Sequence, residues 1–274
     1  MVLLGKKMAI SLPDTVLEDK ESLREKTTKL GFIARSCAIF GVDLIEVFRD
    51  PKMPGEEKMI RRILEYLETP QYLRKRLFPL DEELRYAGML PPLRIPSHKA
   101  KITSDRLAVG EVREGVVNVD GTVDIGLDVA PRLKQKSPPG KRVTVRVTSL
   151  TPLVADLIPK EKTGPYWGYS METKTIGEVL SDARYGVKIA TSRLGTPVAD
   201  ELVRLRSSLQ RAEGVKLIFG SPSRGLFDIV GPELPRKVDF VVNLFPEQHV
   251  ETVRTEEALL VSLGVVSLLD IEKA

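Results

Sequence analysis

Near its C-terminus the chain reads Val241-Val242-Asn243-Leu244-Phe245-Pro246-Glu247-Gln248-His249-Val250-Glu251-Thr252-Val253-Arg254-Thr255-Glu256-Glu257-Ala258. The order is an apolar strand, then a polar loop, then the start of an apolar helix. A strand whose carboxyl end leads through a loop into a helix N-terminus is where open α/β sheets hold ligands. The stretch therefore predicts an α/β fold with a binding site at this end of the chain.

Two loops upstream have a similar setting. Loop 220–225 follows an apolar strand expected at 216–219. Loop 190–195 begins within the last residues of a strand expected at 187–191 and continues beyond it. The glycines of loop 220–225 permit positive φ and let backbone amides approach a ligand. That loop alone is a weak signal, because a tight connection without a ligand has the same composition. Together with the C-terminal loop, the two loops predict one site built from three adjacent loops.

The N-terminal part of the chain predicts two βα units. The expected elements are a strand at 8–12, a helix at 19–41, a strand at 43–48 and a helix at 56–67. Apolar residues recur every three or four positions in the helices.

Helical signals return after the middle of the chain. Thr175 and Glu178 form a capping box, and Pro197 opens a further helix. Three leucines of that helix are expected to face inward: Leu202, Leu205 and Leu209.

The middle of the chain is β-rich. Short β-branched runs alternate with turns, and strands are expected at 116–119, 122–125, 143–147 and 153–157. This pattern is typical of a small antiparallel barrel of the oligonucleotide-binding (OB) type, which binds single strands along a basic face. The predicted fold is therefore α/β, with a sheet domain of residues 1–92 and 170–274 interrupted by an OB-like, RNA-binding barrel of residues 93–169.

Positive charge is concentrated in the same middle region. The net charge is +4, and residues 70–150 hold 15 Lys and Arg against 9 Asp and Glu. Such an excess attracts phosphates, although a solvated surface has the same composition. The residues expected to contact RNA are Arg132, Lys134, Lys136, Lys141 and Arg142.

Composition excludes several other classes. Cys37 is the only cysteine, and His98 and His249 are the only histidines, so neither a disulfide framework nor a structural metal site is expected. No bilayer-length apolar run and no signal-peptide pattern is present, so a cytoplasmic location without a membrane partner is the default. Neither a Walker A sequence nor a three-glycine dinucleotide fingerprint occurs, which disfavours a P-loop NTPase and an ordinary Rossmann enzyme.

The last helix is apolar around most of its circumference from Ala258 onward. Two of its sides must be covered, one by the sheet and the other by a second subunit, which predicts a homodimer through this helix. Glu256 and Glu257 in the first turn suit the positive end of the helix dipole.

Tyr166, Trp167 and Tyr169 form a local aromatic cluster. Two interpretations are open: the rings stack RNA bases, or they clamp the place where the barrel rejoins the sheet domain.

The C-terminal run resembles a motif of the SPOUT superfamily of RNA methyltransferases, in particular the archaeal and eukaryotic branch with an inserted OB-like domain. Further segments that match in the expected order are 69–75, 78–79, 88–93, 113–115, 166–169 and 190–193. The resemblance covers nearly the whole chain. It implies a C-terminal trefoil knot that binds S-adenosylmethionine, a homodimer through the C-terminal knot helices, and methylation of rRNA or tRNA.

Carried onto this chain, the resemblance implies a set of cofactor-binding residues: Thr191, Arg193, Phe219, Gly220, Asn243, Leu244, Gln248, Thr252, Val253 and Thr255. Arg193, Arg254 and Glu256 are the candidates for catalysis, with Glu257 as a further possible proton acceptor. Two positions depart from the family pattern: Ser221 replaces a second glycine, and Glu247 replaces the glycine of Pro-Gly-Gln. The rival interpretation is an RNA-binding or ribosome-assembly protein that has the knot but transfers no methyl group. A weaker alternative is a methyltransferase that acts on protein.

Overall fold

The computed structural model describes residues 6–270. The described chain forms two compact units. The first, the α/β unit, holds residues 6–65, 82–91 and 169–270, and the second, the barrel unit, holds residues 66–81 and 92–168. The sequence pattern places residues 66–81 in the sheet domain, but the structure assigns them to the barrel unit.

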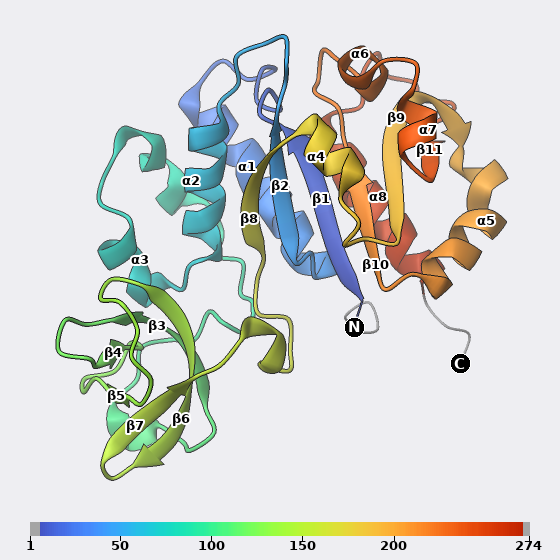
Figure 1. Cartoon of the computed structure of the whole chain (residues 1–274). Helices are drawn as coiled ribbons and strands as arrows, with labels where there is room; N and C mark the ends of the chain where they lie inside the picture. The colour runs from blue at the N-terminus through green and yellow to red at the C-terminus, as the bar shows by residue number, and fades with distance from the viewer. Residues whose placement is uncertain (1–5, 271–274) are drawn as a thin grey trace. The chain divides into compact units, whose positions relative to one another are not determined.

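The α/β unit is built on a parallel sheet, shown in Figure 1. The strand order is β11-β9-β10-β1-β2-β8, and each neighbouring pair is parallel. The inner strands are near-continuous apolar runs, as expected for a sheet covered on both faces. The strands are β1 (Lys7–Pro13), β2 (Leu44–Arg49), β8 (Ser170–Thr175), β9 (Val187–Pro197), β10 (Gly214–Ile218) and β11 (Phe240–Asn243). The sequence pattern does not predict β8, whose only apolar residue is Met171.

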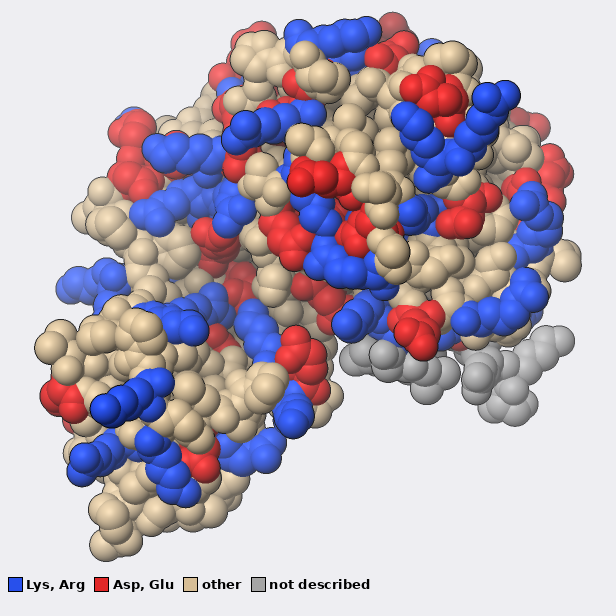
Figure 2. Space-filling model, in the orientation of Figure 1, with Lys and Arg blue, Asp and Glu red and all other residues tan. Residues whose placement is uncertain are grey.

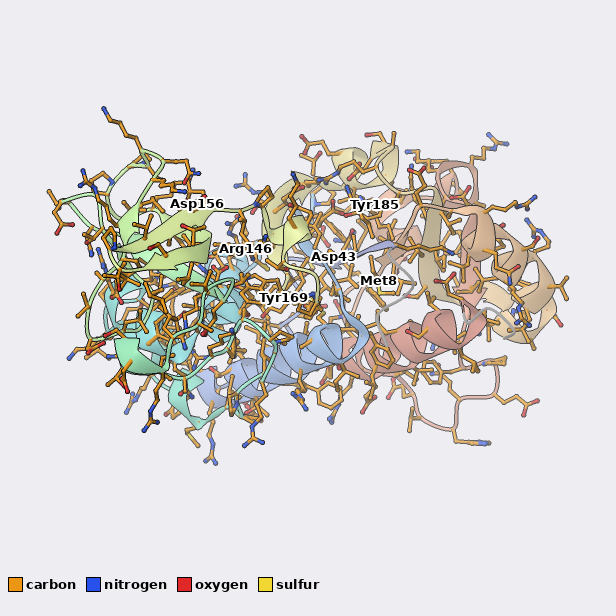
Figure 3. The ribbon with its side chains drawn as sticks, turned by 90° about the horizontal axis from the view of Figure 1, so that it is seen from below. Met8, Asp43, Arg146, Asp156, Tyr169 and Tyr185 are labelled. Carbon is orange, nitrogen blue, oxygen red and sulfur yellow. The ribbon has the colours of Figure 1, made fainter. Side chains whose placement is uncertain are left out.

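Helices cover both faces of this sheet. Long helices α1 (Leu23–Phe40) and α8 (Thr255–Leu269) pack against each other on one face, and α4 (Ile176–Ser181) lies on the other (Figures 1 and 3). The remaining helices of the unit are α5 (Val198–Arg211), α6 (Leu226–Val230), α7 (Leu234–Lys237) and most of α2 (Glu57–Glu68), with 3₁₀ turns η1 (Glu82–Leu84) and η2 (Ala87–Met89).

Helix starts follow local capping chemistry. Helix α1 begins at Leu23 rather than at 19, because the Ser22 side chain accepts a hydrogen bond from the Glu25 amide and the Glu25 carboxylate accepts one from the Ser22 amide. The predicted capping box of Thr175 at α4 is confirmed. Pro197 is the N-cap of α5 rather than its first residue.

The inward face of α5 is narrower than predicted. Leu205 and Leu209 are buried, but Leu202 is 39% exposed. The prediction that all three leucines face inward is therefore wrong for Leu202.

The barrel unit contains a sheet in the order β4-β3-β6-β7-β5. Strands β5 and β7 pair in parallel and the other pairs are antiparallel. A bridge from Thr122 to Arg132 brings the two edges together, so the sheet is nearly a closed barrel around an apolar core. Its elements are β3 (Val112–Val117), β4 (Val123–Asp124), β5 (Arg132–Leu133), β6 (Arg142–Leu150), β7 (Leu153–Leu157), α3 (Gln71–Leu77), η3 (Ser104–Arg106) and η4 (Lys160–Lys162).

Helix α3 explains why residues 66–81 belong to the barrel. The Tyr72 hydroxyl donates to the carbonyl oxygen of Glu114 in β3 at 2.7 Å. The Arg76 guanidinium donates to the Val117 carbonyl at 3.1 Å, so two turns of α3 are tied to one strand. Such pairings over more than forty residues leave no local sequence signal.

Candidate functional site

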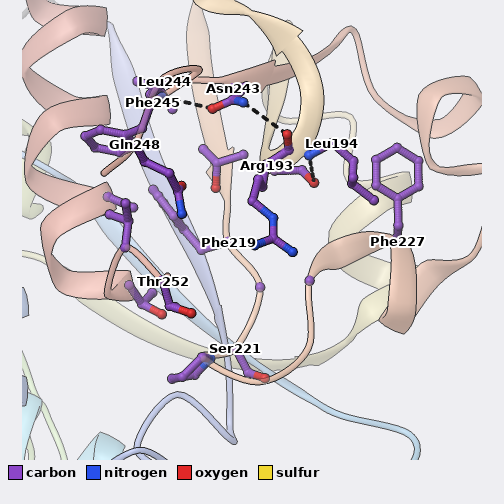
Figure 4. A pocket seen from close by; sticks show the side chains of 18 of the residues that line it. Arg193, Leu194, Phe219, Ser221, Phe227, Asn243, Leu244, Phe245, Gln248 and Thr252 are labelled. Atoms are coloured by element: carbon purple, nitrogen blue, oxygen red, sulfur yellow. Dashed lines mark hydrogen bonds between the residues drawn. The ribbon is translucent and has the colours of Figure 1, made fainter. Parts of the chain in front are cut away.

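Three segments surround one cavity of 290 Å³: a bulge within β9 and the loops that follow β10 and β11. The carboxyl ends of neighbouring parallel strands lie at the same edge of a sheet, so the loops that follow them converge. Glu251, Thr252 and Val253, which precede α8, and Thr255, its first residue, complete the wall (Figure 4).

The first loop is a wide bulge in β9. Ala190 pairs with Val241, but the next pair in register is Thr196 with Val242. Residues 191–195 therefore leave the ladder while β11 advances by a single residue, and residues 191–194 line the cavity. At the end of the bulge, a Cβ on Gly195 would lie 2.7 Å from the Val241 carbonyl oxygen, so the two backbones can approach only because this residue has no side chain.

Asn243 ties the first loop to the third. Its side-chain amide donates to the Arg193 carbonyl oxygen at 3.0 Å, and its side-chain oxygen accepts from the Phe245 amide at 2.9 Å (Figure 4). Farther along, the Gln248 side chain donates to the carbonyl oxygens of Val250 and Glu251 at 2.9 and 3.0 Å. These bonds fix the loops through their backbones.

The second loop is a closed turn after β10. The Ser221 amide donates to the Arg224 carbonyl oxygen at 2.9 Å, and the Ser221 hydroxyl accepts from the Arg224 amide at 3.1 Å. Ser221, one of the two departures from the family pattern, thus has a defined role in the turn. The other departure, Glu247, is exposed and is not part of the cavity wall.

The structure brings together all ten residues that the resemblance implies for the cofactor. The wall contains Thr191, Arg193, Phe219, Gly220, Asn243, Leu244, Gln248, Thr252, Val253 and Thr255. Their binding role stays a prediction, since the structure shows only their common location.

The three catalytic candidates lie in different places relative to the cavity. Arg193 lines the cavity, and its guanidinium extends across it in Figure 4. Arg254 is exposed outside the wall, and Glu256 is buried, with a carboxylate oxygen 3.1 Å from the Lys29 ammonium nitrogen. Glu257 caps α8 by accepting from the Arg254 amide at 3.0 Å. Only Arg193 of these candidates is therefore placed to meet a ligand in the cavity.

Sequence reasoning missed part of the wall. Phe227 and Asp228, in the first turn of α6, line the side that includes Leu194. The signal was present, because they lie two and three residues after loop 220–225, in the first turn of the helix that follows it. Other lining residues outside the predicted set are Ser192, Ser221, Pro222, Ser223, Gly225, Val242, Phe245, Glu251 and Ala258.

The barrel unit carries the positive charge of the chain. It holds 16 Lys and Arg against 10 Asp and Glu, whereas the rest of the chain has 26 against 28. Basic side chains predominate on the face of this unit visible in Figure 2. Four of the predicted RNA contacts are exposed: Arg132, Lys134, Lys136 and Lys141.

Arg142 differs from those four. Its guanidinium is 2.6 Å from a Glu68 carboxylate oxygen and 2.7 Å from one of Glu114. Burial lowers the pKa of Arg142, but the two carboxylates outweigh this effect and hold the pKa above its usual range. The charge of Arg142 is compensated inside the barrel unit, which corrects its assignment to the RNA-binding surface.

The aromatic cluster is largely buried. The Trp167 indole nitrogen donates to a Glu114 carboxylate oxygen at 2.7 Å within the barrel unit. The Tyr169 hydroxyl donates to the Leu64 carbonyl oxygen at 2.8 Å within the α/β unit. Because both rings are at least 95% buried, they are not open to RNA bases.

Residues 6–270 contain no helix with the length and apolar character needed to span a bilayer. They also contain no group of three or more His, Cys, Asp or Glu side chains arranged to hold a metal ion.

Comparison with known proteins identifies the family. Residues 7–266 match the model of the family described as "Putative RNA methyltransferase". An uncharacterized protein of Halobacterium salinarum is 35% identical over 96% of this chain and 99% of its own length. The human 28S rRNA (uridine-N(3))-methyltransferase is 33% identical over 94% of this chain and 77% of its own, and the Drosophila melanogaster protein of the same name is 31% identical over 94% and 61%. The chain therefore belongs to this family of RNA methyltransferases.

Proposed function

We propose that this protein transfers a methyl group from S-adenosylmethionine to N3 of a uridine in ribosomal RNA. The observation that carries the proposal is the convergence of the β9 bulge and two strand-end loops on one cavity in a chain of an RNA methyltransferase family. The target atom follows from the names of the human and fly relatives.

The residues present fit the cofactor. Phe219, Leu244 and Val253 offer apolar surface for the adenine ring, and the hydroxyls of Thr252 and Thr255 offer polar contacts. The cavity volume of 290 Å³ is close to the lower end of the range for small-molecule sites, roughly 300 Å³. When bound, S-adenosylmethionine would supply a methyl group bonded to a cationic sulfur, with the neutral thioether S-adenosylhomocysteine as the leaving group.

Arg193 is the residue proposed to act on the base. N3 of uracil must lose its proton to become a nucleophile, and the negative charge then spreads to the two ring carbonyl oxygens. A guanidinium held at the cavity stabilises that charge through directed donors. The hydrogen bond from Asn243 to the Arg193 carbonyl holds the backbone from which this side chain extends.

The proton acceptor is proposed among the carboxylates of the cavity wall. These are Asp228 and Glu251. Asp228 is exposed, and one of its carboxylate oxygens accepts from the Gly225 amide at 2.9 Å. A carboxylate within reach of the imide hydrogen removes the proton as general base.

The barrel unit is proposed to hold the RNA. Arg132, Lys134, Lys136 and Lys141 present positive charge that phosphates neutralise with release of counterions. One acidic group lies close to this set: an Asp156 carboxylate oxygen is 3.5 Å from the Lys134 ammonium nitrogen.

The resemblance to SPOUT enzymes supports two further parts of the proposal, a C-terminal trefoil knot and a homodimer through α8. Val261 and Leu268 on this helix are 37% and 69% exposed, which leaves apolar surface for a second copy to cover.

The decisive experiment incubates the purified protein with labelled S-adenosylmethionine and ribosomal RNA from cells that lack the gene. We expect 3-methyluridine among the digested nucleosides by mass spectrometry. Arg193→Ala should lower the rate by about a hundredfold or more, the cost of removing one charge-stabilising group. Arg254→Ala, whose side chain lies outside the cavity, is the matched control and should stay within a few fold.

Two outcomes contradict parts of the proposal. Cofactor binding with no methylated nucleoside favours an RNA-binding or ribosome-assembly role without chemistry. A methylated protein and no affinity for RNA at moderate salt indicate a protein substrate instead.

A further inference from the structure

We propose that Asp50 and Arg224 form a positioning pair that sets the shape of loop 220–225 for cofactor binding, with Glu18 as a second anchor. This inference rests on the proposed function, because it assumes that loop 220–225 contacts the cofactor. None of the three side chains lines the cavity.

Arg224 holds loop 220–225 through hydrogen bonds on the side away from the cavity. Its guanidinium donates to both carboxylate oxygens of Asp50, and its second terminal nitrogen donates to the Asp228 carbonyl oxygen at 3.0 Å. Its backbone bonds to Ser221 in both directions. One residue therefore joins the start of the turn, the first turn of α6 and the end of β2.

The direction of Arg224 distinguishes it from its neighbours. Ser221, Pro222, Ser223 and Gly225 all line the cavity, whereas the Arg224 side chain is 16% exposed and pairs with Asp50 instead. Because the Arg224 side chain is bound to Asp50 and not directed into the cavity, the other loop residues can line the cavity wall.

Asp50 is itself held in place. Its side chain has 0% exposure, its amide donates to an Asp14 carboxylate oxygen at 3.0 Å, and its carboxylate accepts from the Lys52 amide at 2.8 Å. Buried ion pairs contribute little net stability, because desolvation offsets the attraction, but they fix geometry. A buried pair directly behind a cavity loop therefore points to positioning.

Glu18 supplies the independent second contact. One of its carboxylate oxygens accepts from both the amide and the hydroxyl of Ser223, each at 2.8 Å. Ser223 lies in the cavity wall one residue before Arg224, so the outer half of the loop is held at two successive residues.

The test compares Arg224→Met with Arg49→Met. Arg49 lies next to Asp50 and also makes an ion pair, with Glu57 at 3.3 Å, but its side chain is 70% exposed and it does not touch the loop. Calorimetry with S-adenosylmethionine should show Kd raised about tenfold or more in Arg224→Met, since a loop that must be ordered on binding lowers affinity. Arg49→Met should bind as the wild type does.

Three readouts separate positioning from general support of the fold. In Arg224→Met, KM for S-adenosylmethionine should rise while the Kd for RNA stays within about twofold, because charge on the barrel unit is unchanged. Arg224→Lys should recover part of the affinity, since it keeps the charge that faces Asp50 but loses the second nitrogen that donates to the Asp228 carbonyl oxygen. Hydrogen exchange should accelerate in the peptide 219–230 and not in β1 or β2.

Glu18→Ala keeps the proposal testable if variants of the buried pair fold poorly. It removes only the Ser223 contacts and should raise the cofactor Kd in the same direction. Folded variants of Arg224 and Glu18 with wild-type affinity and wild-type exchange in 219–230 overturn the proposal. If the wild type itself binds no S-adenosylmethionine, the proposed function fails, and exchange in 219–230 still decides whether the pair positions the loop.

Discussion

Replacing Gly195 by alanine should both destabilise the protein and weaken cofactor binding. A Cβ at this position would lie 2.7 Å from the Val241 carbonyl oxygen, 2.7 Å from the Val242 carbonyl carbon and 2.8 Å from that of Val241. All three atoms belong to the backbone of β11, which cannot rotate away as a flexible side chain does.

The size of the effect follows from this geometry. Relieving the contacts to an ordinary 3.4 Å separation requires β9 and β11 to part by about 0.7 Å, and overpacking of this kind typically costs about 1–3 kcal/mol. For a chain of this size each kcal/mol lowers Tm by about 2–4 °C. The displaced segment ends the bulge that carries Arg193, so we expect Kd for S-adenosylmethionine to rise about tenfold or more.

Gly177→Ala is the matched control. The nearest atom to its added Cβ is the Thr175 hydroxyl oxygen at 3.9 Å, and the residue lies in α4. Alanine should stabilise there by about 0.5–1 kcal/mol. Thermal unfolding by circular dichroism gives the stability, and calorimetry gives the affinity. A Gly195→Ala protein with the Tm and cofactor Kd of the wild type refutes the reasoning.

Three further predictions concern side chains whose roles the structure distinguishes. Arg142→Met should lower the stability of the barrel unit by about 3 kcal/mol, because it leaves the buried Glu114 carboxylate without a charged partner and Glu68 with Lys160 alone. Lys136→Met should leave Tm unchanged and reduce the salt dependence of RNA binding by about 0.7 in log–log slope; equal RNA-binding losses in both variants contradict the assignment. Burial lowers the pKa of His98 from its ordinary 6.5, so as the pH falls the imidazole is protonated in the unfolded chain before it is protonated in the folded one. The free energy of unfolding should therefore fall by up to about 1.4 kcal/mol per pH unit below pH 6.5. Urea unfolding measured over a range of pH should show that this slope disappears in His98→Asn. Glu256→Gln should destabilise the α/β unit by about 1–3 kcal/mol, because it removes a charged partner of buried Lys29, but leave kcat unchanged at temperatures where the variant is folded; a large loss of kcat restores Glu256 as a catalytic candidate.

Local sequence signals predicted much of the α/β unit. The capping residues Thr175 and Glu178 start α4 where expected, since a capping box is a contact between residues three positions apart. The loops 190–195, 220–225 and the C-terminal run were predicted to share one site, and their residues line one cavity. Loop 220–225 and the C-terminal run converge because parallel strands place their carboxyl ends at one edge whatever their order. Residues 191–195 join them because they leave the β9 ladder beside the last residues of β11.

Contacts between distant residues were not accessible in the same way. Arg142 and its basic neighbours are indistinguishable in sequence, and only pairing with Glu68, 74 positions away, removes Arg142 from the charged surface. Glu256 likewise looks like an ordinary first-turn acid until α8 packs on α1 and brings it to Lys29.

The sequence by itself determined the alternation of strands and helices, the position of the β-rich segment and the charge of each part, because these depend on periodicity and composition along the chain. Only the tertiary structure decided that residues 191–195 leave the β9 ladder, that α3 belongs to the barrel unit and that Arg224 is held by Asp50. Each of these depends on register or burial between segments far apart in the chain, and such pairings are selected by the packing of the whole unit.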